Sequence, residues 1–246
     1  MKTRMLLLVS SLLLAVSASA GSKVSEKRNL SGFEAIEISG SPKVVYTQGK
    51  TFSVRVEGER ESVDDIETTV HGKTLEVRNK GKYGIFNITF GDSRHAVVYV
   101  TSPDLVSVKL GGSGDFESKS RVDTDRLHIL LRGSGDIDFK DIICDHCKTE
   151  LVGSGDIEID RLEAIESTVS LIGSGDVKVA QWRVEKTDVS LKGSGDVTVN
   201  FVKGCLTANC VLQGSGDITL KGELGQLKKQ KSGSGDIHTG SLRIGR

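Results

Sequence analysis

The sequence predicts an all-β protein built as a parallel β-helix, a solenoid in which each coil of the chain stacks on the one before. Three observations support this fold class: a four-residue motif that returns about every 20 residues, a period-two alternation of apolar residues after each motif, and the lack of any ten-residue stretch with helical periodicity. We expect coils of about 20 residues over 111–246, preceded by a less regular β region at 21–110 that is continuous with the solenoid.

The first twenty residues have the features of a secretory signal peptide. Lys2 and Arg4 precede an apolar run at 5–16, and residues 18–20 form a small-residue cleavage pattern. The run is about a dozen residues long, whereas a membrane-spanning helix needs roughly twenty. We therefore expect cleavage after Ala20 and a mature chain with no membrane span, exported to the periplasm or the cell exterior.

The composition excludes several classes of protein. With 37% hydrophobic residues and 27% charged residues, the chain can build a core and is not intrinsically disordered. The 33 basic residues balance the 33 acidic residues, so there is no electrostatic reason to bind nucleic acid. The 11 aromatic residues also weaken any model based on stacking of bases or sugar rings.

The N-terminal β region, from residue 21 to residue 110, is predicted to form short strands without the repeated motif. Apolar and β-branched residues alternate at 33–38, 44–47, 52–57, 74–78 and 96–101, and a degenerate corner stands at Gly40-Ser41-Pro42. The segment 80–92 gathers the one aromatic cluster of the chain. It is either a loop or hairpin folded onto the solenoid wall or an exposed binding surface. Its rings belong to Tyr83, Phe86 and Phe90.

The repeat proper is Gly-Ser-Gly-Asp, which occurs seven times at intervals of 19 to 21 residues. Such a period marks stacked units that cannot bury their apolar faces alone. A propeller blade would need about forty residues, and a leucine-rich repeat would carry its own Asn or Cys. The motif carboxylates are Asp115, Asp136, Asp156, Asp176, Asp196, Asp217 and Asp236.

Positions one and three residues after each motif Asp are predicted to face inward. In the three central units, positions 6, 8, 13 and 15 are also apolar or small, so each unit should contain two or three short strands joined by corners. For the first central unit these residues are Ile137, Phe139, Ile142, Cys144, Thr149 and Leu151, and position 6 of the next two units is Leu162 and Trp182.

The motif has two interpretations. In the first, it is a tight corner: the glycines permit positive φ, and Ser and Asp hydrogen-bond the local backbone. In the second, the stacked carboxylates form a calcium ladder, since Gly-rich turns with Asp bind calcium in other β-rolls. The ladder residues would be Asp136, Asp156, Asp176 and Asp196. Those calcium rolls use a nine-residue unit, so we expect the corner and no bound cofactor.

Four cysteines in an exported chain suggest disulfides. The two pairs lie about three coils apart, roughly 14 Å at β spacing, beyond the Cα separation of about 7 Å that a disulfide allows. Only Cys144 with Cys147 and Cys205 with Cys210 are sensible pairs, and buried thiols are the alternative. Zinc is disfavoured because a structural site needs four ligands.

These features together resemble a family, the head GIN domain of putative auto-transporter adhesins. The resemblance runs through Asn29–Phe33, Gln48-Gly49, Gly72–Leu75 and Val100–Leu105 into the Gly-Ser-Gly-Asp series, nearly the whole mature chain. It implies a right-handed β-helix in the cell envelope or outside the cell, and it carries no catalytic residues over to this chain.

Catalysis is disfavoured on the residues themselves. The five His residues occupy unrelated registers, and the repeated carboxylates lie in like environments, so their pKa values have no reason to diverge as acid–base catalysis requires. We therefore expect an exported, non-enzymatic binding, adhesin-like or structural module of the cell envelope, with an envelope protein or a surface polysaccharide as partner. The alternatives are a β-helical carbohydrate-active enzyme and a calcium-stabilised scaffold. Residues 221–246, rich in lysine, should form a polar cap.

Overall fold

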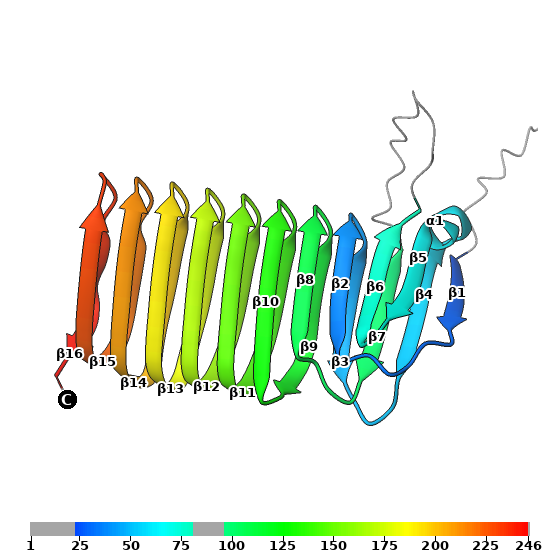
Figure 1. Ribbon diagram of the computed structural model, residues 1–246, viewed down its shortest axis with the longest axis horizontal. Helices are drawn as coiled ribbons and strands as arrows, with labels where there is room; N and C mark the ends of the chain where they lie inside the picture. Colours follow the sequence, from blue (N-terminus) through cyan, green and yellow to red (C-terminus); the bar gives the residue numbers. More distant parts are fainter. Residues whose placement is uncertain (1–22, 81–95, 246) are drawn as a thin grey trace, which may run out of the picture.

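The structure, a computed structural model, describes residues 23–80 and 96–245. The described chain forms one row of stacked coils, with the C-terminal coils at one end and a short helix at the other (Figure 1). It is almost entirely β, and its strands join in a single 16-stranded sheet that winds around one core. The predicted parallel β-helix with coils of about 20 residues is confirmed.

Each regular coil is one long, bent strand that runs from a motif Asp to the Gly that opens the next motif. Neighbouring coils pair in parallel and in register, so that Asp136 lies opposite Asp156 and Gly153 lies opposite Gly173. The coils are β11 (Asp136–Gly153), β12 (Asp156–Gly173), β13 (Asp176–Gly193), β14 (Asp196–Gly214), β15 (Ile218–Ser232) and β16 (Ile237–Ile244).

The burial pattern divides each coil into three faces. In β12 the buried residues fall in three groups, 157–159, 162–164 and 167–171, separated by exposed or half-exposed residues at 160–161 and 165–166. The Gly-Ser-Gly turn supplies the third corner. Of the two predicted arrangements, two or three short strands per coil, the structure has three.

The first coils are assembled from shorter strands. Around the core before β11 these pair in parallel: β2 (Ala35–Gly40), β3 (Lys43–Gln48), β6 (Thr74–Asn79), β7 (Val97–Ser102), β8 (Ser107–Gly112), β9 (Asp115–Asp123) and β10 (Arg126–Gly133). The degenerate corner behaves like the later ones, since Gly40 has φ +94° and its carbonyl accepts hydrogen bonds from the N–H groups of Ser113 and Gly114.

The N-terminal end of the solenoid is closed by antiparallel strands and a helix. β1 (Lys23–Arg28) pairs with β4 (Ser53–Glu59), β4 with β7, and β5 (Ile66–His71) with β6, all antiparallel. Helix α1 (Arg60–Asp65) lies at this end and buries Val63 completely. Reversing the strand direction and adding a helix keeps the first coil from offering a free parallel edge.

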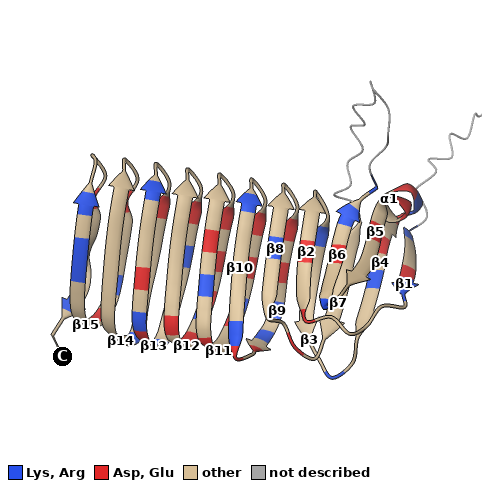
Figure 2. Ribbon diagram, viewed as in Figure 1, with Lys and Arg blue, Asp and Glu red and all other residues tan. Residues whose placement is uncertain are grey.

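The C-terminal end is closed by charge. β16 covers β15 only as far as Leu224, and the rest of β15 carries lysines, so that the outermost strand is largely blue in Figure 2. Its register places Lys229 opposite Cys210 and Lys231 opposite Leu212, both buried inward positions of β14. Lysine at an inward position of an edge strand discourages the addition of further strands.

The predicted inward positions are buried through the regular coils, with one correction. The side chains of Ile137, Phe139 and their counterparts in β12, β13 and β14 are all at most 2% exposed. Trp182, however, is half-exposed, and the prediction that it faces inward was wrong. A register shift in β13 places Gln181 opposite Leu162, and Gln181 is fully buried.

The buried Gln181 is accommodated by a polar network. Its Nε2 donates to Ser167 Oγ at 3.0 Å, and Thr187 Oγ1 donates to its Oε1 at 2.7 Å. All three side chains are at most 2% exposed. A buried amide is tolerated here because both its donor and its acceptor are paired. The shift that places Gln181 inside also places Trp182 on the surface.

In the described parts of the chain, no helix has the length and apolar character that crossing a membrane requires.

Candidate functional site

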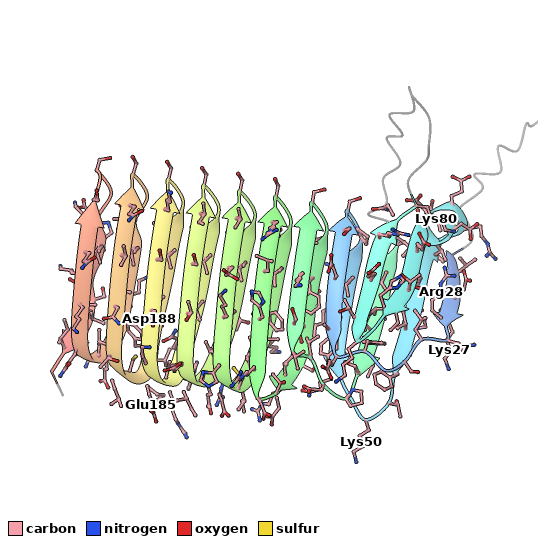
Figure 3. All side chains as sticks on the ribbon, viewed as in Figure 1. Lys27, Arg28, Lys50, Lys80, Glu185 and Asp188 are labelled. Carbon is pink, nitrogen blue, oxygen red and sulfur yellow. The ribbon has the colours of Figure 1, made fainter. Side chains whose placement is uncertain are left out.

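A groove of about 810 Å³ runs along the solenoid at the corner away from the motif turns. It crosses all six coils from β11 to β16. Figure 3 labels one of its residues, Glu185, at the edge of the coils opposite the Gly-Ser-Gly turns. We name its three rows of residues by their order along each coil. The upstream row is Ile143, Glu163, Arg183, Lys203, Glu223 and Arg243; the floor row is Cys144, Ala164, Val184, Cys205, Leu224 and Ile244; the downstream row is Ile165, Glu185, Leu206, Gly225 and Gly245.

The floor row closes the core beneath the groove. From Cys144 to Leu224 these residues lie opposite one another in successive coils and are at most 7% exposed. They are mostly small, so the coil bends closely around the core at this point. The groove therefore has a continuous floor of paired backbone above an apolar interior.

Glycines widen the C-terminal half of the groove. Gly204, Gly225 and Gly245 line it, one in each of the last three coils. A Cβ at Gly204 or Gly245 would meet no atom within 4 Å, so the space beside them is open. Gly204 has φ +88°, a conformation that glycine adopts without strain.

Exposed apolar side chains gather at this groove. Five large apolar side chains are strongly exposed in the described chain, and three of them line the groove: Ile165 at 45%, Leu206 at 64% and Ile244 at 55%. Single exposed apolar residues are ordinary, but three that line one groove, in the alternate coils β12, β14 and β16, indicate a binding surface.

The charged residues of the groove fall into paired and unpaired groups. Glu163 is paired with Arg161, and Glu223 lies 3.9 Å from Arg243. Arg183, Lys203 and Glu185 have no oppositely charged partner among the described residues. The two unpaired cations both belong to the upstream row.

Trp182 lies beside these cations and holds one of them. The Nζ atom of Lys203 is 5.8 Å from the centre of the indole ring, and the guanidinium carbon of Arg161 is 4.9 Å from it. Such cation–π contacts position the lysine and occupy the ring. Trp182 thus acts as a support for the upstream row.

The second candidate site is the ladder of motif carboxylates at the opposite corner. From Asp156 to Asp217, each motif Asp accepts a hydrogen bond from the backbone N–H of the Asp in the following coil. For example, Asp176 N–H donates to Asp156 at 3.0 Å, and Asp196 N–H to Asp176 at 3.3 Å. One carboxylate oxygen of each residue is therefore used to join coils. The motif therefore does form a corner, but its Asp hydrogen-bonds the backbone of the next coil and not, as predicted, that of its own turn.

The middle of the ladder is crowded with negative charge. Burial first, and repulsion by neighbouring carboxylates, raise the pKa of both Asp136 and Asp138 above the ordinary value, although a hydrogen bond from Asp156 partly offsets this at Asp136. The described residues contain no group of three or more His, Cys, Asp or Glu side chains arranged to hold a metal ion. The calcium alternative for Asp136, Asp156, Asp176 and Asp196 stays an untested hypothesis.

A family model described as "Putative auto-transporter adhesin, head GIN domain" matches residues 32–223. The chain belongs to this family. The match covers both the irregular first coils and most of the groove, so the family assignment extends to the whole described solenoid except its ends. The resemblance inferred from the motifs is confirmed.

Solved structures share the fold at low identity. A putative adhesin from Bacteroides fragilis is 23% identical, with a TM-score of 0.73 over 88% of this chain and 96% of that one. A putative adhesin from Parabacteroides distasonis is 19% identical, with a TM-score of 0.72 over 89% and 97%. A protein from the same organism described as a putative lipid binding protein is 24% identical, with a TM-score of 0.65 over 89% and 97%. No curated protein matches this head GIN chain significantly.

The predicted aromatic binding surface lies outside the described residues. Tyr83, Phe86 and Phe90 all fall within residues 81–95, so their proposed role stays a prediction. Among the described rings, Tyr46, Phe116 and Phe139 are buried and stack along the core.

The four cysteines are free, buried thiols in this structure, which therefore contains neither predicted disulfide. A hydrogen bond to Cys147, reinforced by burial, raises the pKa of the Cys144 thiol. Burial raises the pKa of Cys205 and brings that of Cys210 to about 12. The pKa of Cys147 is instead lowered by its hydrogen bond with Cys144. Oxidation of Cys144 with Cys147 and of Cys205 with Cys210 stays a prediction.

Sequence reasoning missed the groove. Two signals were present: outward-facing apolar residues at 165 and 206, and a second glycine series at 204, 225 and 245 with the same period as the motif. A glycine that recurs outside a turn motif indicates a place where the wall of the solenoid lacks side chains.

Proposed function

We propose that this head GIN protein is an exported, non-enzymatic binding module of the cell envelope, and that the groove is its ligand-binding surface. The observation that carries the proposal is the alignment of Ile165, Leu206 and Ile244 along one groove. Its volume lies in the range of sites that enclose small ligands. The family's adhesin description agrees with a binding role.

The chemistry of the groove favours binding over catalysis. Its lining residues include no His, Ser or Thr, and the two thiols in the floor row, Cys144 and Cys205, have raised pKa values and are poor nucleophiles. Two of its carboxylates, Glu163 and Glu223, are committed to arginine partners. A general acid and a general base with separated pKa values are not supplied by these residues.

A surface polysaccharide is the less favoured partner. Sugar rings stack on exposed aromatic faces, and the one aromatic residue beside the groove is Trp182. Its ring is already in contact with Arg161 and Lys203. An apolar ligand would contact the exposed apolar side chains of the groove. This agrees with the lipid-binding description of one structural neighbour.

The proposal can be tested with Nile red, a neutral dye that fluoresces in apolar sites. The groove variant replaces Ile165 and Leu206 with Asp, and the control variant replaces Val152 and Ile172 with Asp. The control residues are exposed apolar side chains of β11 and β12 that lie outside the groove. All four are exposed, so neither variant should unfold the protein.

We expect saturable dye binding by the parent and by the control variant, and at least tenfold weaker binding by the groove variant. A parent protein that fails to bind the dye, or equal binding by both variants, would contradict the proposal.

A further inference from the structure

We propose that the groove holds a single-chain anionic amphiphile of the fatty-acid type, with its carboxylate between Arg183 and Lys203 and its hydrocarbon chain along the glycine-lined half. This inference rests on the proposed function and names the ligand class of the same groove. Three features of the described residues support it: floor residues that are paired between coils from β12 to β15, the exposed apolar side chains of Leu206 and Ile244 in the C-terminal half, and the two cations Arg183 and Lys203, which have no oppositely charged partner among the described residues.

The floor selects against an extended peptide. Ala164, Val184, Cys205 and Leu224 lie opposite one another in the coil-to-coil pairing, and Gly245 N–H donates to the carbonyl of Leu224 at 3.0 Å. A bound peptide needs partners for its own backbone groups, and pairing of this kind leaves none along the floor. A hydrocarbon chain needs no hydrogen bonds, so it loses nothing on entering.

The C-terminal half of the groove fits such a chain. From β13 to β16 the downstream row carries Glu185, Leu206, Gly225 and Gly245, and the floor row ends at Ile244. The upstream row continues past the two cations with Glu223 and Arg243, which pair with each other. The three coil spacings amount to roughly 14 Å of length at the usual strand separation. Gly204 and Gly245 leave open space beside them, and Leu206 and Ile244 supply apolar contacts, so burial of methylene groups drives binding at about 0.8 kcal/mol each.

The cations supply the site for the head group. Arg183 and Lys203 belong to neighbouring coils and line the same row of the groove. Neither has a carboxylate partner among the described residues, whereas Arg243 farther along the row has Glu223. Arginine binds a carboxylate through two parallel hydrogen bonds, and the contact of Lys203 with Trp182 holds the second cation in place.

Glu185 provides a further test of the assigned position of the carboxylate head group. It lies in the downstream row of the same coil as Arg183 and has no cationic partner among the described side chains. A carboxylate ligand would feel its repulsion, whereas a cationic ligand would be attracted to it. Replacement of Glu185 by Gln should therefore strengthen carboxylate binding a few-fold, while replacement of the two cations should weaken it.

The test compares three ligands with the same twelve-carbon chain by isothermal titration calorimetry below their micellar concentrations. Dodecanoate is anionic, 1-dodecanol is neutral and dodecylamine is cationic. We expect the parent to bind dodecanoate at least tenfold more tightly than dodecanol, and dodecylamine most weakly. Acetate, which has the head group without the chain, should not compete.

Variants locate the head group and the chain. Arg183→Gln with Lys203→Gln should reduce dodecanoate affinity to that of dodecanol and leave dodecanol binding unchanged. The matched control, Arg132→Gln with Lys192→Gln, removes two exposed cations outside the groove and should change neither. Ile244→Asp should weaken both ligands more than Ile165→Asp does, because the chain is assigned to the C-terminal half.

The outcomes separate this inference from the proposed function. Equal affinity for the three ligands would overturn the head-group assignment and leave a general apolar groove in place. Dye binding without binding of any twelve-carbon ligand would overturn the amphiphile and leave another apolar partner, such as a protein segment. Absence of both dye and amphiphile binding would overturn the proposed function as well.

Discussion

The motif corner and the groove corner of the solenoid differ in how closely neighbouring coils approach each other. At the motif corner the backbones of neighbouring coils touch: a Cβ at Gly155 would lie 2.0 Å from the carbonyl oxygen of Gly135, and a Cβ at Gly175 would lie 1.9 Å from that of Gly155. At the groove corner a Cβ at Gly204 would meet no atom within 4 Å. Contact between coils requires glycine throughout the motif corner. At the groove corner it does so at Gly225, where a Cβ would lie 2.6 Å from the carbonyl oxygen of Leu206, but not at Gly204.

This difference separates structural repetition from functional variety. The motif corner repeats the same four residues because each coil must fit the one before it, and the Asp side chain then ties the coils together. The groove corner has fewer such contacts to satisfy, and its residues differ from coil to coil. Ligand recognition is expected where the residues vary from coil to coil. The residues that repeat in every coil say least about the partner of the protein.

The largest effect should come from placing the same methyl group at each corner. Gly175→Ala should destabilise the protein by about 4 kcal/mol or more, since the new Cβ meets backbone that cannot move aside. Gly204→Ala should cost only about 1 to 2 kcal/mol, from its positive φ alone. Urea unfolding of both variants measures the difference. Equal losses would show that the two corners are equally tight.

A buried charge tests the inward register between the corners. Val179 is 2% exposed, and Val179→Asp should destabilise the fold by several kcal/mol because the carboxylate has no partner in the core. Ser190→Asp adds the same group at an exposed position of the same strand and should change stability by less than about 0.5 kcal/mol. An unchanged melting temperature for Val179→Asp would disprove the register.

The contacts between coils explain which features could be predicted from the sequence and which could not. The motif period and the apolar alternation predicted the coils and the burial of Val177 and Val179, because both patterns record the coil-to-coil contact directly. The exchange of Gln181 and Trp182 was not predictable, since a one-residue register shift leaves the spacing of the motifs unchanged. The groove was missed because it forms where several coils have residues that differ from one coil to the next. The periodicity of the sequence shows only the residues that the coils have in common.

An intermediate effect should come from the polar network that accompanies this shift. Gln181→Leu would leave Ser167 and Thr187 buried without their partner, at a cost of about 1 to 3 kcal/mol. Adding Ser167→Ala and Thr187→Val removes the unpaired groups and should recover much of the loss. Thermal unfolding of the single and triple variants gives the coupling. If the stability losses caused by the separate substitutions simply add up in the triple variant, the three residues do not act as a unit.

A smaller effect should come from the ladder at the motif corner. Asp176→Ala removes one of the two acceptors of the backbone N–H of Asp196, the other being the carbonyl of Gly175, and should cost about 1 kcal/mol or less. Asp176→Asn keeps an acceptor oxygen and should recover most of that. If Asn is as destabilising as Ala, the role of the ladder is electrostatic, and calcium titration of the parent, for which we predict no rise in melting temperature, becomes the deciding measurement.

The smallest effect concerns pH at the crowded middle of the ladder. The pKa of Asp138 is raised by burial and by its acidic neighbours, so the folded protein binds a proton there more tightly than the unfolded chain does. The destabilising contribution of Asp138 is therefore fully present at pH 7 and is relieved as the pH falls through the folded pKa toward the ordinary Asp value of about 3.9. Asp138→Asn should melt slightly above the parent at pH 7, and this advantage should shrink on acidification. Thr198→Asn, which adds an amide without removing a charge, should differ from the parent by the same amount at every pH. An advantage for Asp138→Asn that grows as the pH falls would reverse the sign and show that its carboxylate is stabilised by a partner in the fold.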